Sequence, residues 1–210
     1  MRETALIALA TFFATVGPLD IAVIFAALAQ KHTAAERRTM ALKGAIIGGG
    51  ILLFFALAGG AVLKVFGITL AAFQTAGGVL LLLIAIDMVF ARSTGGTTTT
   101  DEEYTEAAHR HDLSVFPLAT PLIAGPGAIG ASILLMANAH GDPARISIVI
   151  GALVVILILT YVSMLGATRL HRLLGVTGSH VITRIVGILL AALAVQFMFD
   201  GIRASGLFHS

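Results

Sequence analysis

The sequence has no cysteine and no tryptophan, and only 11% of its 210 residues are charged. The absence of cysteine excludes disulfides, thiolate metal sites and a cysteine nucleophile. The scarcity of charge excludes an ordinary soluble domain, in which about a quarter of the residues are charged, and 58% of the residues here are hydrophobic. The net charge of +2 gives no basic signature of nucleic-acid binding, so we expect the lipid bilayer, and no nucleic acid, as a partner.

Long stretches of the chain contain no Asp, Glu, Lys or Arg, and several of them are long enough to cross a hydrocarbon core of about 30 Å as a helix. The apolar runs and their polar boundaries predict an all-α membrane protein with six transmembrane helices. The predicted spans lie near residues 4–29, 42–64, 69–91, 113–137, 146–168 and 181–203.

The basic residues are distributed unevenly between the two ends of these spans. Nine of the 13 Lys and Arg residues lie in or beside the segments that follow the first, third and fifth spans. The positive-inside rule therefore predicts a multi-pass protein of the bacterial inner membrane, with both termini in the periplasm and loop 92–112 in the cytoplasm.

The two halves of the chain repeat a pattern. Gly17-Pro18 and Gly125-Pro126 are 108 positions apart, and Gly67-Ile68-Thr69 and Gly175-Val176-Thr177 have the same separation. We therefore divide a single membrane domain, 1–210, into repeat 1–91, linker 92–112 and repeat 113–210. Each repeat has three spans, an odd number, so the second is predicted to be inverted relative to the first, as in many transporters.

Both Gly-Pro pairs fall near the middle of a span, where proline removes a backbone donor and breaks a helix. Pro117 and Pro121 interrupt the fourth span further. Helices 1 and 4 are therefore expected to be broken, with half-helix N-termini and bare carbonyls near the membrane centre, which suits a zwitterionic or anionic solute. The alternative is that these prolines only kink the helices for packing.

Asp20 follows the first break, at a depth where an ionisable side chain is costly unless it is functional. It is the leading candidate for proton or cation coupling, and the alternative is a cap of the second half-helix. Hydroxyl and amide groups near the breaks could bind solute or bond back to their own helices. The candidate binding residues are Thr15, Gly17, Pro18, Asp20, Gln74, Thr75, Thr120, Pro121, Gly125, Pro126 and Gly127.

Three other polar residues and one small-residue motif stand out. Asp87 and Arg184 are expected at similar depth on antiparallel helices, where they could form an ion pair, and Gln196 lies deeper in the sixth span. Gly44-x-x-x-Gly48 is a weak signal for helix dimerisation, so a homodimer is a further partner that the sequence allows.

The linker contains acidic residues and histidines that could bind a transition metal. Their spacing matches no specific metal site, so a solvated acidic linker is the alternative. No catalytic or cofactor motif is present, and we expect no enzyme activity, no cofactor and no resident metal. The residues concerned are Glu102, Glu103, Glu106, His109, His111 and Asp112.

Several segments together resemble the MarC family of six-span prokaryotic inner-membrane proteins. The most specific is FPLATPLIAGPGAI at 116–129, and the first span departs from the family in having Gly17-Pro18-Leu19-Asp20 instead of Asp-Pro-Leu-Gly. The other segments are residues 36–38, 41–43, 66–68, 72–81, 86–88, 182–184, 196–197 and 200–201.

The resemblance implies a transporter-like protein related to LysE-type exporters, and some members of the family are linked to small neutral amino acids such as alanine and glycine. The expected function is therefore a secondary transporter or exporter of such a solute or a similar metabolite. A divalent-metal exporter, or a membrane-bound metal protein that uses the linker, is the competing interpretation.

Overall fold

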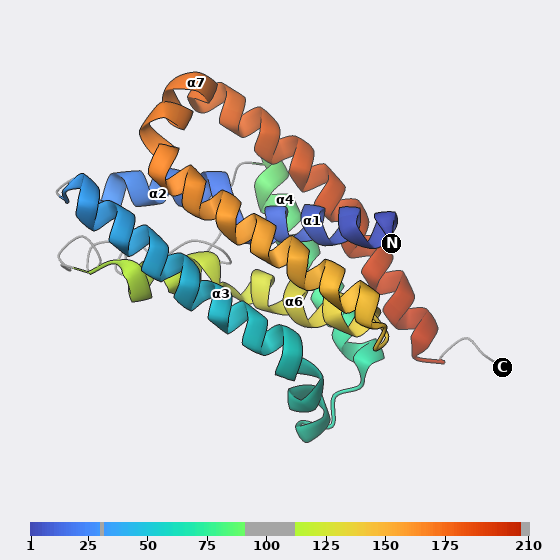
Figure 1. The fold of residues 1–210 in the computed structure, drawn as a ribbon. Coiled ribbons are helices and arrows are strands. Elements are labelled where there is room, and N and C mark those ends of the chain that lie inside the picture. The colour runs from blue at the N-terminus through green and yellow to red at the C-terminus, as the bar shows by residue number, and fades with distance from the viewer. Residues whose placement is uncertain (30–31, 91–111, 207–210) are drawn as a thin grey trace.

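The computed structural model describes residues 1–29, 32–90 and 112–206, and the regular structure in these ranges is entirely helical (Figure 1). Large apolar side chains lie exposed along the outer helix faces, as expected for helices that contact lipid tails. The elements are α1 (Arg2–Val16), α2 (Pro18–Leu28), α3 (Ala34–Val65), α4 (Leu70–Phe90), η2 (Ser114–Ile123), α6 (Pro126–Asn138) and α7 (Pro143–Ala204).

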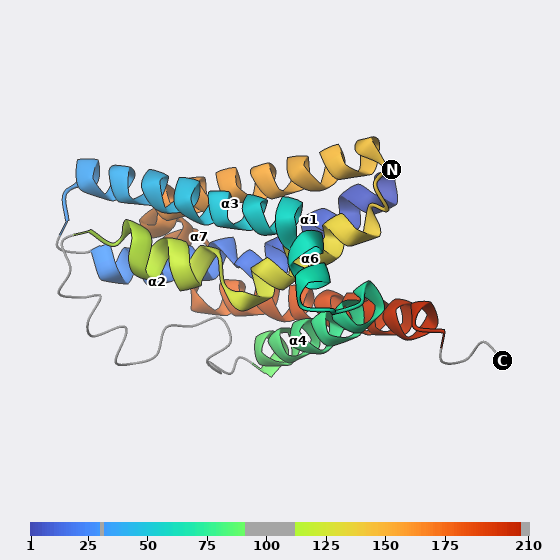
Figure 2. The ribbon, with the colours of Figure 1, turned by 90° about the horizontal axis from the view of Figure 1, so that it is seen from below.

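Five helical segments are long and apolar enough to cross a bilayer, and the bent pair η2–α6 adds a sixth when it is counted as one span. Helix α7 supplies two of them, Pro143–Gly166 and Arg184–Ala204, because its second arm turns back toward the end from which the first arm starts (Figure 1). The start of α1 and the end of α7 lie at this same end, called the terminal end below (Figures 1 and 2). The predicted all-α membrane fold is confirmed.

The first span is broken at Gly17. This residue has φ 65° and ψ 59°, a left-handed conformation that glycine adopts without a steric penalty. The N–H of Gly17 donates to the carbonyl of Phe13 at 3.0 Å and ends α1. Pro18 is the first residue of α2, where its missing N–H removes no intrahelical bond. The predicted segment 4–29 is therefore two helices, separated at the predicted dipeptide.

The fourth span is interrupted over a longer stretch. Its first part, η2, is a π-helix whose backbone leaves the helical region at Phe116 and Thr120, the residues before two prolines. Gly125 is extended, with φ −78° and ψ 167°, and the axes of η2 and α6 differ by 56°. The predicted break at Gly125-Pro126 is confirmed, and so is the further interruption predicted from Pro117 and Pro121, which takes the form of a π-helix at residues 114–123.

The two half-helices that follow the breaks share their first residue type and first hydrogen bond, although Gly17 is left-handed and Gly125 extended. Proline is the first residue of both α2 and α6. The N–H of Ile21 donates to the carbonyl of Gly17, and the N–H of Ile129 to that of Gly125, each at 3.0 Å. These bonds are 108 positions apart, so the sequence repeat coincides with a repeated local structure.

Helix α3 begins at Ala34, eight residues before the predicted start of the second span. Thr33 and Glu36 form a capping box, in which each side chain accepts a hydrogen bond from the other residue's backbone N–H. This motif satisfies two N–H groups that a helix terminus otherwise leaves free. The predicted boundary was wrong because the helix continues through the charged residues 36–38 and beyond the apolar segment.

Helix α3 uses glycines to approach η2 closely. A Cβ atom added to Gly48 would lie 2.6 Å from Cγ2 of Ile123, and one added to Gly44 would collide with Leu118. Both glycines are buried within the chain. The Gly44-x-x-x-Gly48 motif therefore serves packing within the chain, and the dimer signal that it suggested has this intramolecular explanation.

Helix α4 and the second arm of α7 contact each other reciprocally. A Cβ added to Gly78 would lie 2.7 Å from the carbonyl oxygen of Ala194, and one added to Gly187 would lie 3.2 Å from that of Ala85. Residues 78 and 187 are 109 positions apart, and so are residues 85 and 194. Such exchange of equivalent partners is typical of a two-fold relation. It supports the inverted repeat, whose superposition over both whole halves stays a prediction.

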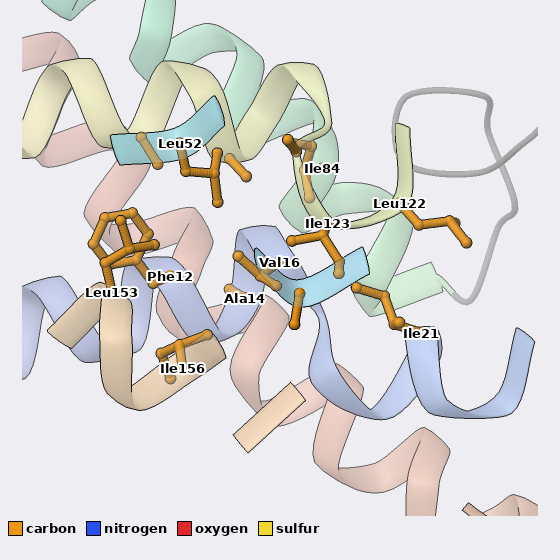
Figure 3. Close-up of a cluster of buried hydrophobic side chains, with 14 of the residues drawn as sticks. Phe12, Ala14, Val16, Ile21, Leu52, Ile84, Leu122, Ile123, Leu153 and Ile156 are labelled. Atoms are coloured by element: carbon orange, nitrogen blue, oxygen red, sulfur yellow. The ribbon is translucent and has the colours of Figure 1, made fainter. Parts of the chain in front are cut away.

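The two breaks adjoin one buried cluster. Val16 and Ile21 flank the first break, Leu122 and Ile123 precede the second, and Figure 3 draws all four in the same apolar core. Each of these side chains is at most 5% exposed. Tight apolar packing in this cluster therefore holds the helix ends at both breaks.

Candidate functional site

A cavity of about 1090 Å³ opens toward the terminal end, between α1, α4, α6 and both arms of α7. Apolar residues such as Ala10 and Leu189 line its inner part, and toward the terminal end the lining mixes apolar side chains with ionisable and amide groups. Groups of both charge signs can bind the two ends of a zwitterion. The polar lining residues are Glu3, Thr4, Gln74, Asn138, His140, Arg145, Gln196, Asp200 and Arg203.

Gln74 connects two helices at the wall of this cavity. Its Nε2 atom donates to Oδ1 of Asn138 at 2.5 Å, which joins α4 to α6. Gln74 is 5% exposed, so the amide needs this partner to offset its loss of hydration. Of the predicted binding residues, Gln74 is brought into the cavity.

Gln196 and Asp200 lie one turn apart on the second arm of α7. Gln196 Nε2 donates to Oδ1 of Asp200 at 2.9 Å, and both line the cavity. On the first arm of α7, Nε of Arg145 lies 3.5 Å from Oδ2 of Asp142, and both side chains are exposed. The predicted deep residue Gln196 is therefore a cavity residue, and Asp200 orients its amide.

The three predicted threonines bond back to their own helices. Thr15 Oγ1 donates to the carbonyl of Thr11 at 2.8 Å, Thr75 to that of Ala71 at 3.0 Å, and Thr120 to that of Val115 at 3.4 Å. This is the common arrangement of membrane threonines. Their hydroxyl protons are occupied, and only their oxygen lone pairs remain to accept from a solute.

Asp20 is the third residue of α2, and its carboxylate folds back toward the break. A Cβ added to Gly17 would lie 3.3 Å from Oδ2 of Asp20. A negative group in the first turn interacts favourably with the helix dipole. Asp20 also borders a crevice of about 10 Å³ with Gly17, Pro18 and Leu19. This position fits a coupling carboxylate and a helix cap alike.

The second break is packed tightly around its glycines. A Cβ on Gly125 would lie 2.7 Å from the carbonyl oxygen of Pro121, and one on Gly127 would collide with Ile84. Pro126 is exposed, whereas Gly125 and Gly127 are buried. The backbone at this break thus reaches its neighbours only because two residues have no side chain.

Asp87 and Arg184 lie on stretches of α4 and α7 that pack together, since the neighbouring Gly187 approaches Met88. Asp87 is half-buried and Arg184 is exposed. The two residues are thus brought to adjoining elements, and the ion pair between them stays a prediction.

The profile of the MarC family, described as "MarC family integral membrane protein", matches residues 3–205. The chain belongs to the MarC family. It is 38% identical to a UPF0056 membrane protein of Methanocaldococcus jannaschii over 95% of this chain and 96% of that protein. It is 36% identical to the UPF0056 membrane protein YhcE of Escherichia coli over 91% and 88%. No solved structure matches the chain.

Several segments that carry the family resemblance contribute to the polar cavity, to the second break or to the contact between α4 and the second arm of α7. Segment 72–81 contains Gln74 and the glycine that packs on the second arm of α7, and segment 116–129 forms η2 and the second break. Segments 196–197 and 200–201 supply Gln196 and Asp200 to the cavity. The resemblance stated from the sequence is confirmed by the family match.

Most of the histidine-rich linker of this MarC family chain lies outside the described residues, including Glu102, Glu103, Glu106, His109 and His111. Within the described ranges, no group of three or more His, Asp or Glu residues could hold a metal ion. The metal interpretation of the linker stays untested.

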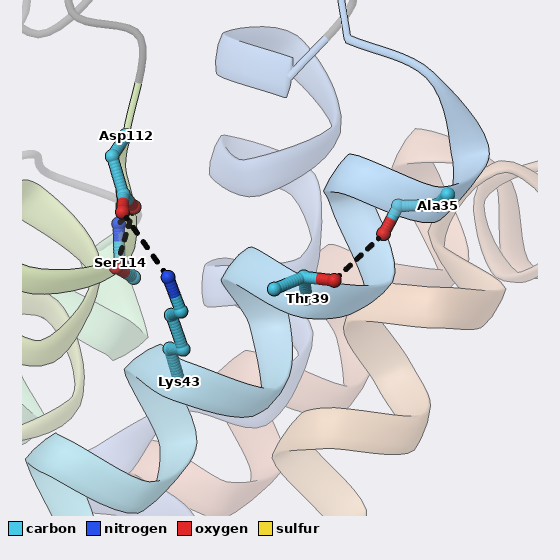
Figure 4. Close-up of polar contacts among 5 residues, drawn as sticks. All are labelled: Ala35, Thr39, Lys43, Asp112 and Ser114. Carbon is cyan, nitrogen blue, oxygen red and sulfur yellow. Dashed lines mark hydrogen bonds and ion pairs between the residues drawn. The ribbon is translucent and has the colours of Figure 1, made fainter.

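Asp112, at the end of the linker, is fixed to the start of η2 (Figure 4). Its Oδ1 accepts from Oγ and N of Ser114 at 2.5 and 2.9 Å, and its Oδ2 lies 3.6 Å from Nζ of Lys43 on α3. The hydrogen bonds from Ser114, followed by the charge of Lys43, outweigh desolvation and lower the pKa of Asp112. The contact joins α3 to the segment that leads into η2, at the end opposite the terminal end.

The sequence did not single out Asn138, His140 or Glu3 as site residues. Asn138 lies one residue beyond the predicted fourth span, and His140 belongs to the turn that follows, with φ 49°. Glu3 lies in the first turn of α1. Polar residues at the ends of spans are common. These three differ from ordinary interfacial groups only because α1, α4, α6 and α7 meet around the cavity that they line.

Proposed function

We propose that this MarC family protein is a secondary transporter or exporter in the prokaryotic inner membrane, and that it moves a small solute with no net charge. A small neutral amino acid or a similar metabolite fits this description. The cavity of about 1090 Å³ carries the proposal. Its volume matches pockets that hold small molecules, which run to about 1000 Å³.

The chemistry of the cavity supports a zwitterionic solute. The carboxylates of Glu3 and Asp200 can meet an ammonium group, and the guanidinium groups of Arg145 and Arg203 can meet a carboxylate. Glu3, Arg145 and Arg203 lie in the first or last turns of their helices, where charged side chains are common. The functional indication is that groups of both signs gather around one cavity.

The two helix breaks support movement across the membrane. The N-termini of α2 and α6 leave N–H groups without intrahelical partners, and such ends bind anionic groups in transporters built from discontinuous helices. Helices broken at Gly17 and Gly125 can also change direction at these residues while the remaining packing is kept.

Energy for net transport requires a coupled ion, and we assign this role to Asp20 at the first break. Asp87 and Arg184 are proposed to hold the end opposite the termini through their pairing, and Gln196 to contact solute from the cavity. The proposal involves no enzyme activity and no cofactor.

Solute counterflow in proteoliposomes tests the proposal. Vesicles loaded with unlabelled glycine, alanine or serine are diluted into a trace of the same radiolabelled solute, and transient accumulation is expected. The control is the cavity variant Asp200→Asn/Arg203→Gln, which should lose accumulation but keep the fold. Absence of counterflow for every small neutral solute would contradict the proposal, and flux of Mn²⁺ or Zn²⁺ instead would favour the metal interpretation.

A further inference from the structure

Three cavities follow one another along α1. The polar cavity shares Ala10 and Leu189 with a second cavity of about 260 Å³, which therefore adjoins it. The second cavity shares Phe13 and Val186 with the crevice at Asp20. The row begins at the terminal end and stops at the first helix break.

The second cavity differs from the first in chemistry. Its described lining is apolar and consists of Leu9, Ala10, Phe13, Ile156, Val186, Leu189 and Leu190. A solute that bears a net charge would lose its hydration there without compensation, at a cost of several kcal/mol. The ammonium and carboxylate of a zwitterion would lose their hydration there in the same way, so this lining fits the short apolar side chain of a small solute.

The crevice at the inner end is too small for such a solute. Its volume is about 10 Å³, close to the space that one water molecule needs. The side chains of Phe13 and Val186 form its boundary with the second cavity, and Phe13 lies only one helical turn before Gly17, about 6 Å along the axis at 1.5 Å per residue. This boundary separates Asp20 from the cavities at the terminal end.

From this arrangement we infer that the three cavities form one solute route and that Phe13 and Val186 are its closed neck, with Phe13 setting the size of the solute that passes. The inference rests on the proposed transport function and adds to it the route and the residue that selects for size. Gly17, immediately beyond the neck, provides the backbone freedom that lets the Phe13 turn move relative to α2.

Cysteine labelling tests the neck without requiring transport, because the natural chain has no cysteine. Leu9→Cys reports on the second cavity and Leu19→Cys on the crevice. An impermeant methanethiosulfonate reagent applied at the terminal end should label Leu9→Cys readily and Leu19→Cys slowly. Adding Phe13→Ala should speed the labelling of Leu19→Cys about tenfold, equivalent to about 1.4 kcal/mol.

Phe54→Ala is the matched control, since Phe54 is 58% exposed on α3, outside the three cavities. It should leave the labelling rate of Leu19→Cys unchanged. If the alanine variant folds poorly, Phe13→Leu, which keeps an apolar side chain, takes its place. It should give an intermediate labelling rate of Leu19→Cys. An unchanged rate in both Phe13 variants would overturn the neck, and so would a Leu9→Cys that the reagent cannot reach, because lipid would then fill the second cavity.

Counterflow with glycine, alanine, valine and leucine completes the test. Wild type should exchange the smaller members, and Phe13→Ala should extend exchange to the larger ones. Exchange by wild type without any labelling change in Phe13→Ala would refute the neck and keep the proposed function. The expected labelling change in a protein that exchanges no solute would refute the proposed function, and with it the role of Phe13 in size selection.

Discussion

Gln74 on α4 donates a hydrogen bond to Asn138 on α6, and this bond joins the two repeats at the wall of the polar cavity. The chain passes through 63 intervening residues between the two partners, so the bond is a tertiary contact. It gives the cavity a fixed polar wall in a bundle whose core is built mainly from apolar side chains.

The bond predicts how substitutions at residue 74 affect stability. Gln74→Leu leaves the Asn138 amide without its partner and should lower the free energy of unfolding by about 1–2 kcal/mol, the upper range for interhelical bonds in membranes. Chemical denaturation in detergent measures this. Gln74→Leu/Asn138→Leu should recover part of the loss, and Gln196→Leu, whose bond stays within one helix, should cost less. Equal losses in the Gln74 and Gln196 variants would contradict the prediction.

The reciprocal glycines predict a contrast between glycine positions. Gly78→Ala and Gly187→Ala introduce a methyl group against the opposing helix and should each destabilise the protein by about 1–3 kcal/mol. Gly50→Ala and Gly151→Ala are the controls, because a Cβ at either position meets nothing within 4 Å. These controls should be neutral or stabilising by up to about 1 kcal/mol, since alanine is the better helix former. Thermal unfolding followed by circular dichroism distinguishes the two groups.

Asp20→Asn separates the two interpretations of this residue. A coupling carboxylate must change its protonation or ion occupancy, so the variant should lose uptake driven by a pH or sodium gradient while solute exchange persists. A helix cap would tolerate the change, because Asn caps helices about as well as Asp. The measurement compares gradient-driven uptake by wild type and variant after matched thermal stability is confirmed. Unchanged uptake means that Asp20 is not the coupling group.

The Asp112 contact predicts an acid dependence of stability. Because the folded state lowers the pKa of Asp112, its contribution is complete above the unfolded pKa of about 3.9 and disappears as the pH falls through the lower folded value. The side chains of Asp112 and Lys43 are 55% and 56% exposed, so the contribution should not exceed about 1 kcal/mol. Ser114→Ala removes the main cause and should flatten this part of the stability–pH profile below pH 5. A profile identical to that of wild type would refute the assignment.

Single cysteines also test the orientation in the membrane. Ala34 and Val65 are exposed at opposite ends of α3. If the terminal end faces the periplasm, an impermeant reagent added to intact cells should label Val65→Cys and spare Ala34→Cys. Permeabilised cells provide the control, in which both should react. The reverse pattern would place the termini in the cytoplasm.

Local chemistry explains which features of the fold could be predicted. The breaks at Gly17 and Gly125 follow from proline, whose missing donor acts on its own helix whatever surrounds it. The six spans follow from the length of the apolar runs. The start of α3 did not follow, because its first two turns contain Glu36, Arg37 and Arg38 and extend beyond the apolar segment.

The candidate site was less accessible to sequence reasoning. Polar residues near the breaks were the natural choice, yet Thr15, Thr75 and Thr120 satisfy their hydroxyl groups locally. The cavity depends on which faces of four elements meet, and no spacing in one helix encodes that. Asn138 and His140 become significant only because α6 ends beside Gln74 and the second arm of α7.

The break at Gly17 also makes the access of water to the first span measurable. The N–H group of Leu19 is in the first turn of α2, where a helix supplies no carbonyl acceptor of its own, although this residue lies far along the first span. Backbone deuterium uptake at the Leu19 amide should therefore report the access of water to the first helix break. The neighbouring N–H of Ile21 donates to the carbonyl of Gly17 at 3.0 Å. It should stay protected and provide the reference exchange rate.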